Sequence, residues 1–171
     1  LFEVLPTSFV PNEDQGYVMA AIIMPDGASL DRTEDVADRV EKIFETIPGV
    51  ATRTQLTGYS LLDSGFKTNA GTFFVTLKPF EERYASVKQA RAENSRAVLL
   101  ALHREASSIQ EGMVLPVAPP AIPGIGTTGG FEFWIQDTAA GESARLDALT
   151  REFLVKARMR PELAGLSSTF R

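Results

Sequence analysis

Tyr17-Val-Met-Ala-Ala-Ile-Ile-Met24 is the stretch of this sequence that decides the fold. Its residues are apolar almost throughout, and Pro25-Asp26-Gly27 follows with residues that favour a turn. A short apolar run bounded by turn residues is typical of a buried strand. We therefore expect a buried strand here and use it to place the elements that follow.

A helix is expected directly after this strand. Ser29 can cap it, because a serine hydroxyl accepts a hydrogen bond from the first free backbone N–H groups of a helix. Pro48-Gly49 then ends it. The apolar positions repeat at the spacing of a single helix face, and they are Val36, Val40, Ile43, Phe44 and Ile47.

Three more strands and a second helix follow along the chain. Apolar and β-branched runs predict strands over 50–56, 71–78 and 113–117, with a polar loop over 57–69. Helical spacing predicts a helix over about 85–103. The resulting order, βαββαβ, is that of the ferredoxin-like split-βαβ plan, so the predicted fold class is α+β.

A second βαβ unit begins beyond this fold and does not finish. A Pro- and Gly-rich loop leads into a predicted strand over 131–137, and a helix follows over about 143–158. Leu1 is not Met and the last residues read as the start of a strand, so we expect both ends to be cut points in a longer protein. The expected divisions are a lead over 1–16, a first domain over 17–129 and the start of a second over 130–171.

Composition excludes several classes of function. The 17 Lys and Arg residues are scattered and the net charge is -5, which argues against a nucleic-acid surface. The absence of Cys removes disulfides, thiolate metal sites and Cys nucleophiles. No run approaches the roughly 18–20 apolar residues that a membrane span needs.

The motifs that could carry chemistry all have simpler interpretations. Gly124 to Gly129 match the G-x-G-x-x-G dinucleotide pattern, but a predicted strand follows where that motif needs a helix, so a hinge explains the glycines better. His103 is the sole histidine and falls near a helix end, where a solvated residue is expected. The adjacent acids Glu13-Asp14 and Glu81-Glu82 are expected on the solvated surface. We predict no catalytic residues, no metal site and no cofactor.

The alternation of the predicted strand over 131–137 places Phe131, Phe133 and Ile135 on one face. Such a face can simply be core. The hinge-like loop just before it favours a second interpretation, in which the aromatic pair lines a cleft that opens and closes around apolar ligands. Both interpretations stay open on the residues alone.

The lead resembles the segment that follows the seventh transmembrane helix of resistance-nodulation-division (RND) efflux pumps of the hydrophobe/amphiphile branch. The resemblance covers essentially the whole chain. The matching stretches are Leu5-Pro-Thr-Ser-Phe-Val-Pro-Asn-Glu-Asp-Gln-Gly16, Met24-Pro-Asp-Gly-Ala-Ser29, Pro48-Gly49-Val50, Gly71-Thr-Phe-Phe-Val-Thr-Leu-Lys78 and Gly130-Phe-Glu-Phe133.

This resemblance implies a transporter part and not an enzyme. The chain would belong to the periplasmic porter region of an inner-membrane, proton-driven antiporter of a Gram-negative bacterium, whose proton-relay residues lie outside it. Such multidrug efflux pumps, which confer antibiotic resistance, are homotrimers. They work with a periplasmic adaptor (membrane fusion) protein and an outer-membrane channel, and their substrates are small amphiphilic drugs or detergents.

The resemblance also assigns roles to residues along a cleft between the two porter subdomains. Phe131 and Phe133 would be proximal-pocket phenylalanines, with Ile135 two residues later. Gly58-Tyr59-Ser60-Leu61 would belong to the gating loop, although the stretch up to Phe66 holds fewer glycines than the family's loop. The positions assigned to the pocket-facing strand are Met19, Ala21 and Ile23.

Two other classes of function compete with the pump fragment. The element order alone would fit a free-standing ferredoxin-like module that binds a ligand or regulates a partner. A small acylphosphatase-like hydrolase on this fold would need an anion-cradling loop with a nearby Arg and Asn, and the sequence does not assemble that set.

Overall fold

The computed structural model describes residues 13–122, 133–138, 143–163, 166 and 168. It divides the chain into two compact units, residues 1–130 and residues 131–171. The first unit holds β1 (Tyr17–Ile23), α1 (Leu30–Thr46), β2 (Val50–Ser60), β3 (Gly65–Leu77), α2 (Phe80–Arg83), α3 (Val87–Glu93), α4 (Ser95–Ala106) and β4 (Met113–Val117), and the second holds α5 (Ser143–Arg158).

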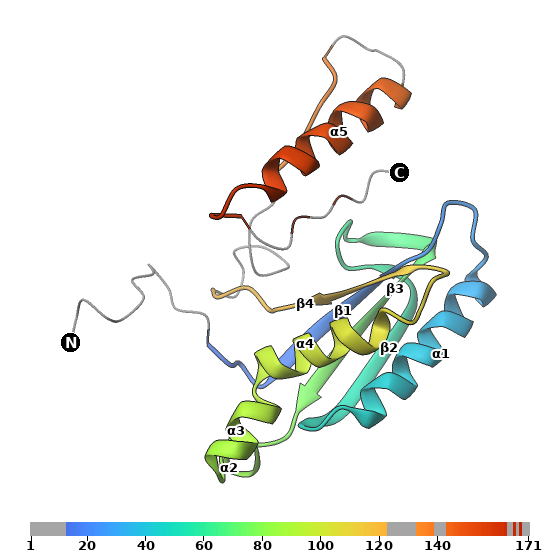
Figure 1. Ribbon diagram of the computed structural model, residues 1–171. Coiled ribbons are helices and arrows are strands. Elements are labelled where there is room, and N and C mark those ends of the chain that lie inside the picture. The colour runs from blue at the N-terminus through green and yellow to red at the C-terminus, as the bar shows by residue number, and fades with distance from the viewer. Residues whose placement is uncertain (1–12, 123–132, 139–142, 164–165, 167, 169–171) are drawn as a thin grey trace. The chain divides into compact units, whose positions relative to one another are not determined.

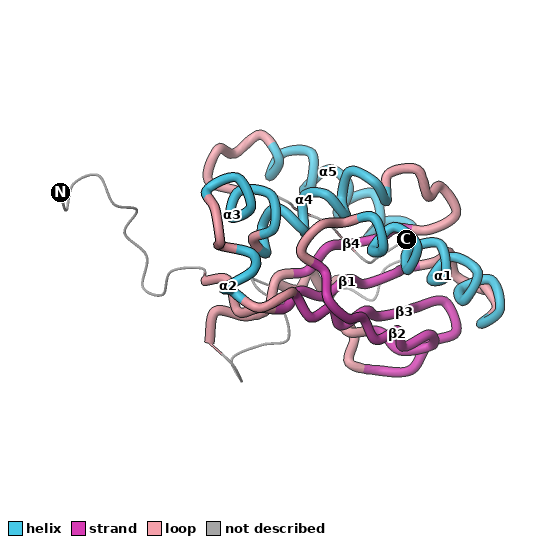
Figure 2. Tube along the Cα trace, turned by 90° about the horizontal axis from the view of Figure 1, so that it is seen from below, coloured by secondary structure: helices cyan, strands magenta, loops and turns pink. Residues whose placement is uncertain are grey.

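The sheet of the first unit has four strands in the order β2-β3-β1-β4, and every neighbouring pair is antiparallel. Figure 2 shows this order along the sheet. Strand β1, which holds the apolar stretch that begins at Tyr17, therefore lies inside the sheet, with β3 on one side and β4 on the other. Together with the helices between the strands, this order confirms the predicted α+β, ferredoxin-like fold.

Helices α1 and α4 lie along the same face of the sheet (Figure 1). Helix α1 begins as the sequence predicts, because the Ser29 hydroxyl accepts a hydrogen bond from the Arg32 amide at 3.3 Å. Its apolar side packs against the sheet, where the ring of Phe44 lies 5.4 Å from that of Phe73. The helix thereby covers β2 and β3, while α4 covers β1 and β4.

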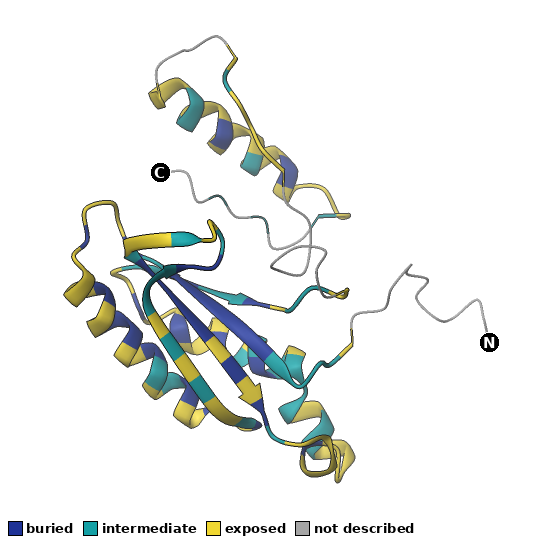
Figure 3. Cartoon of the chain, turned by 180° about the vertical axis from the view of Figure 1, so that it is seen from behind, coloured by how far each residue is buried: buried dark blue, intermediate teal, exposed yellow. Residues whose placement is uncertain are grey.

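The main core lies between these helices and the sheet. Alternate residues of β1, Val18, Ala20 and Ile22, point into it and are at most 1% exposed. Figure 3 shows β1 buried along most of its length, whereas β2 is a mixture of partly buried and exposed positions. The intervening residues of β1 point to the opposite face, where a second, smaller apolar cluster forms.

Two element boundaries differ from the sequence prediction. The helix expected over 85–103 is broken into α3 and α4 at Asn94, whose extended backbone interrupts the helix. The Asn94 side chain accepts a hydrogen bond from the Ala97 amide at 2.9 Å, so it starts a new helix instead of continuing the old one. The loop expected over 57–69 is shorter, because β2 and β3 extend toward each other and leave only the turn Leu61–Ser64.

The second unit confirms the predicted helix as α5 but not the predicted strand. Residues 133–137 form no strand. A strand needs a partner strand for its backbone hydrogen bonds, and the described part of residues 131–171 contains none. The ring of Phe133 instead lies 5.3 Å from that of Phe153 on α5.

Candidate functional site

The sheet face opposite α1 and α4 is here called the open face. It includes Met19 and Ala21 of β1, the strand that the resemblance assigns to the pocket. The antiparallel register places Met19 between Phe74 and Val117, and Ala21 between Thr72 and Leu115. Directly opposed residues share a face of the sheet. The alternation of β1 thus puts Met19 and Ala21 among apolar side chains that do not contribute to the main core.

The turn Leu61–Ser64, here called the hairpin turn, folds onto the open face. Leu61 is 6% exposed and packs with Met19, Ala21 and Val117 in one apolar cluster. Burying a leucine side chain contributes about 1.5–3 kcal/mol. Three of the residues that the sequence assigned to two separate features, Met19 and Ala21 on the strand and Leu61 on the loop, therefore lie together.

Gly58 and the residues after it set the direction of the hairpin. The pairing of β2 with β3 shifts between Thr57 and Tyr59, and Gly58 has a φ of +86°, which L side chains rarely adopt. The rings of Tyr59 and Phe66 then meet edge to face, with centroids 5.6 Å apart. This bulge turns the end of the hairpin relative to the flat part of the sheet.

Polar contacts within the hairpin hold the shape of its turn. The Ser60 hydroxyl donates to the Asp63 carboxylate at 2.7 Å, and the Asp63 amide donates back to the Ser60 oxygen at 3.2 Å. Lys67 Nζ lies 2.8 Å from the same carboxylate. The hydrogen bond from Lys67, followed by that from Ser60, lowers the pKa of Asp63 below its ordinary value. The turn therefore carries a stable negative charge at neutral pH.

Two further residues of the open face are exposed apolar side chains that the sequence interpretation did not select. They are Leu56 at 42% exposure and Phe74 at 37%. Phe74 lies opposite Met19, and Leu56 lies opposite Thr72. The alternation of β3 could have identified Phe74, because its neighbours Phe73 and Val75 both point into the main core.

Ile23 does not belong to this cluster, and the other predicted pocket residues lie in the second unit or outside the described residues. Ile23, at the end of β1, is partly exposed and pairs with Ala70 and Met113. Phe133 and Ile135, at 48% and 39% exposure, belong to the second unit. Phe131 and the Gly124–Gly129 motif lie outside the described residues.

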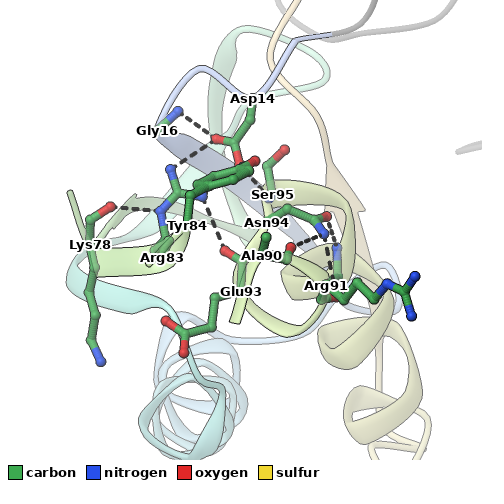
Figure 4. Close-up of polar contacts among 11 residues, drawn as sticks. Asp14, Gly16, Lys78, Arg83, Tyr84, Ala90, Arg91, Glu93, Asn94 and Ser95 are labelled. Carbon is green, nitrogen blue, oxygen red and sulfur yellow. Dashed lines mark hydrogen bonds and ion pairs between the residues drawn. The ribbon is translucent and has the colours of Figure 1, made fainter. Parts of the chain in front are cut away.

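Asp14 and Arg83 form a buried ion pair that the sequence interpretation missed (Figure 4). The guanidinium of Arg83 donates to both Asp14 oxygens, at 2.6 and 3.1 Å, and also to the carbonyls of Lys78 and Glu93. Arg83 is 0% exposed, and the expectation that Asp14 is solvated was wrong. Glu13, by contrast, is exposed as predicted.

The Asp14 carboxylate also accepts the backbone N–H groups of Gly16 and Ser95, at 2.9 and 2.8 Å. Burial raises the pKa of Asp14, but the hydrogen bonds from Arg83, Gly16 and Ser95 together bring it below its usual value of 3.8. The rings of Phe80 and Tyr84 lie against the guanidinium, at 4.8 and 5.6 Å. This pair joins the residues before β1 to the start of α4.

The described residues contain neither an assembled metal site nor a membrane span. No three His, Asp or Glu side chains in that part of the chain are placed to hold a metal ion. None of the helices found there is long and apolar enough to cross a bilayer. His103 is exposed in the last turn of α4, as predicted.

These features define a ferredoxin-like domain with an apolar sheet face that is partly covered by its own hairpin. The chain belongs to the AcrB/AcrD/AcrF family, whose sequence profile matches residues 1–171. This membership confirms the resemblance to RND efflux pumps on which the sequence interpretation rested.

Three relatives illustrate the match. The chain is 38% identical over 139 residues to the multidrug export protein AcrF of Escherichia coli, an alignment that covers 81% of this chain and 13% of AcrF. It is 32% identical over 166 residues to the toluene efflux pump membrane transporter TtgB of Pseudomonas putida, covering 92% of this chain and 14% of TtgB. For the multidrug resistance protein MdtF of Escherichia coli the identity is 32% over 161 residues, covering 94% and 15%. The chain thus spans about one seventh of the length of these relatives.

Proposed function

We propose that this chain is part of the periplasmic porter region of a proton-driven RND efflux pump and contributes to the cleft and the proximal pocket that take up drugs. One observation carries the proposal. Met19 and Ala21, which the family resemblance assigns to the pocket strand, lie beneath Leu61 of the loop that it assigns to gating. A regulated binding cleft needs an apolar binding surface and a loop that can cover or expose it.

The chemistry of such a surface is binding without bond change. The open face offers apolar and aromatic contacts, with Leu56 and Phe74 exposed. Contacts of this kind tolerate diverse apolar ligands, because they are not directional. Transport then follows from conformers that differ in their contacts with the ligand and with neighbouring subunits. Phe131, Phe133 and Ile135 would supply further apolar contacts of the proximal pocket.

The whole protein would be a homotrimer in the inner membrane that works with a periplasmic adaptor protein and an outer-membrane channel. Its relatives are named for the export of multiple drugs and of toluene. We infer that this protein likewise exports small amphiphilic drugs or detergents and that it contributes to antibiotic resistance. Proton coupling would take place in segments outside these 171 residues.

The test is export by the full-length protein in a strain that lacks its own efflux pumps. Replacing both Phe131 and Phe133 by Ala should reduce export of a large apolar drug by about fivefold or more, because truncated anchor residues typically cost over 1 kcal/mol of binding. Leu100→Ala is the matched control, since Leu100 is exposed on α4, on the opposite side of the sheet from the open face. Unchanged export by the double variant would contradict the pocket assignment. A wild-type protein that exports no drug would contradict the function itself.

A further inference from the structure

Thr72 is a fully buried polar residue at the middle of the open face. Its side chain is 0% exposed, and β3 places it between Leu56 on β2 and Ala21 on β1. A buried hydroxyl must find hydrogen-bond partners, because leaving it unpaired is costly. Thr72 finds one partner in Tyr59, near the end of β2, and the other in Leu61, the first residue of the hairpin turn.

The Thr72 hydroxyl takes part in two hydrogen bonds, one as acceptor and one as donor. The Leu61 amide donates to Thr72 Oγ1 at 3.1 Å, and the Thr72 hydroxyl donates to the Tyr59 carbonyl at 2.8 Å. One side chain thereby satisfies a backbone donor and a backbone acceptor at the point where the strand ends and the hairpin turn begins. The Ser60, Asp63 and Lys67 contacts, by contrast, join parts of the hairpin to each other and would survive if the hairpin turn moved as a unit.

The open face is therefore divided into two parts. Leu56 and Phe74 are exposed and can meet a ligand without any rearrangement. Met19 and Ala21 are 4% and 2% exposed and pack in one apolar cluster with Leu61. Thr72 stands on the boundary between these two parts, since it pairs with Leu56 on one side and with Ala21 on the other.

We propose that Thr72 is a latch that holds the hairpin turn over Met19 and Ala21, and that it thereby sets the size of ligand the open face accepts. The inference rests on the proposed function. A small ligand can bind at Leu56 and Phe74 with the latch closed. A bulky ligand must displace Leu61 to gain enough contact, and it must then break both hydrogen bonds of Thr72. Thr72 acts through the hairpin turn and is a positioning residue.

The first experiment measures amide hydrogen exchange in the full-length protein. Thr72→Val keeps the shape of the side chain but removes the hydroxyl, so exchange in residues 59–63 should rise about tenfold, with the rest of the sheet unchanged. Thr72→Ser restores the hydroxyl and should return exchange to the wild-type rate. Thr76→Val is the control, because Thr76 is exposed on the same strand and the same face. Ser60→Ala removes the contacts with Asp63 but leaves both hydrogen bonds of Thr72, so it should raise exchange less than Thr72→Val. Thr72→Ala, which also lacks the hydroxyl, replaces Thr72→Val if that variant does not fold.

The second experiment compares export of ethidium, a small planar cation, with export of the larger macrolide erythromycin. A ligand that needs the opened state binds in proportion to the fraction of molecules that are open. Thr72→Val should therefore raise export of erythromycin relative to ethidium by several-fold and up to about tenfold, and Thr72→Ser should cancel the change. General destabilisation of the protein would instead lower the export of erythromycin and of ethidium by the same factor.

The outcomes separate the latch from the proposed function. Faster exchange in residues 59–63 together with a shifted export ratio supports the latch. If the exchange rate of residues 59–63 is unchanged in Thr72→Val, the proposed latch is wrong. If exchange is faster but the ratio of erythromycin export to ethidium export is unchanged, the latch does not control ligand size. A wild-type protein that exports neither probe overturns the proposed function, and the exchange data still decide whether Thr72 holds the hairpin turn.

Discussion

A buried arginine destabilises a fold unless its charge is paired, because taking an ion out of water costs several kcal/mol. Arg83 meets this condition with one carboxylate and two backbone carbonyls. The carboxylate of Asp14 in turn caps the first N–H of α4 through Ser95. The pair therefore depends on both partners, and removing either one leaves a buried charge without compensation.

Arg83→Met should lower the free energy of unfolding by about 3–5 kcal/mol, because it leaves the Asp14 carboxylate buried and unpaired. The measurement is the urea unfolding curve of the 171-residue chain followed by circular dichroism. Arg151→Met is the matched control. Arg151 also pairs with an aspartate, Asp147, but its side chain is 74% exposed, and such surface pairs contribute about 0–1 kcal/mol. Equal losses in the two variants would contradict a special role for the buried pair.

The residue scale also shows what sequence reasoning can find and what it cannot. The apolar stretch of β1 was identified correctly as a buried strand, because a short apolar run bounded by turn residues is a local property. Asp14 was misplaced on the surface, because its partner lies 69 positions away and nothing local marks the pair. The hydrogen bonds of Thr72 to the hairpin were missed for the same reason, since a threonine in a strand usually signals only β propensity.

At the scale of elements, the sequence predicted strands and helices well where the apolar residues kept the spacing of a single strand or helix without interruption. The helix over Leu30–Thr46 and all four strands of the sheet are present. Errors arose where side chains decide a boundary. Asn94 divides one expected helix into two by capping the second, and the pairing of β2 with β3 extends both strands into a segment that composition alone marks as loop.

Gly49 joins α1 to β2 and lies against Glu93, whose backbone contacts Arg83. Its φ is +88°, and a Cβ there would lie 2.9 Å from the Glu93 Cβ and 3.0 Å from the Glu93 carbonyl oxygen. That same carbonyl accepts a hydrogen bond from Arg83. A side chain at position 49 would therefore strain the turn and displace a partner of the buried arginine.

Gly49→Ala should destabilise the chain by about 1–3 kcal/mol more than Gly27→Ala, because overpacking adds to the cost of the left-handed backbone. Gly27 is the matched control. Its φ of +81° is similar, but an added Cβ would meet nothing within 4 Å. Thermal unfolding of the two variants gives the comparison. If both lose the same stability, backbone conformation alone explains Gly49, and the contact with Glu93 has no effect.

At the scale of the whole molecule, the described residues of both apolar clusters belong to the first unit. The second unit offers α5, on which Leu149 and Phe153 are 48% and 40% exposed. The first unit holds a four-stranded sheet with helices, whereas the described part of the second unit holds one helix. We propose that the boundary at about Gly129 to Gly130 separates two domains of unequal stability.

A chain that ends at Gly130 should unfold with a free energy within about 0.5 kcal/mol of that of the first unit in the intact chain, because its cores are unchanged. Removing residues 1–14 instead takes away Asp14 and should cost about 3–5 kcal/mol. Urea unfolding followed by circular dichroism measures both. The intact chain should then show an additional transition at lower urea, since two compact units need not unfold together. If cutting at Gly130 destabilises the chain as much as removing Asp14 does, the two parts form one cooperative domain, and the proposed boundary is wrong.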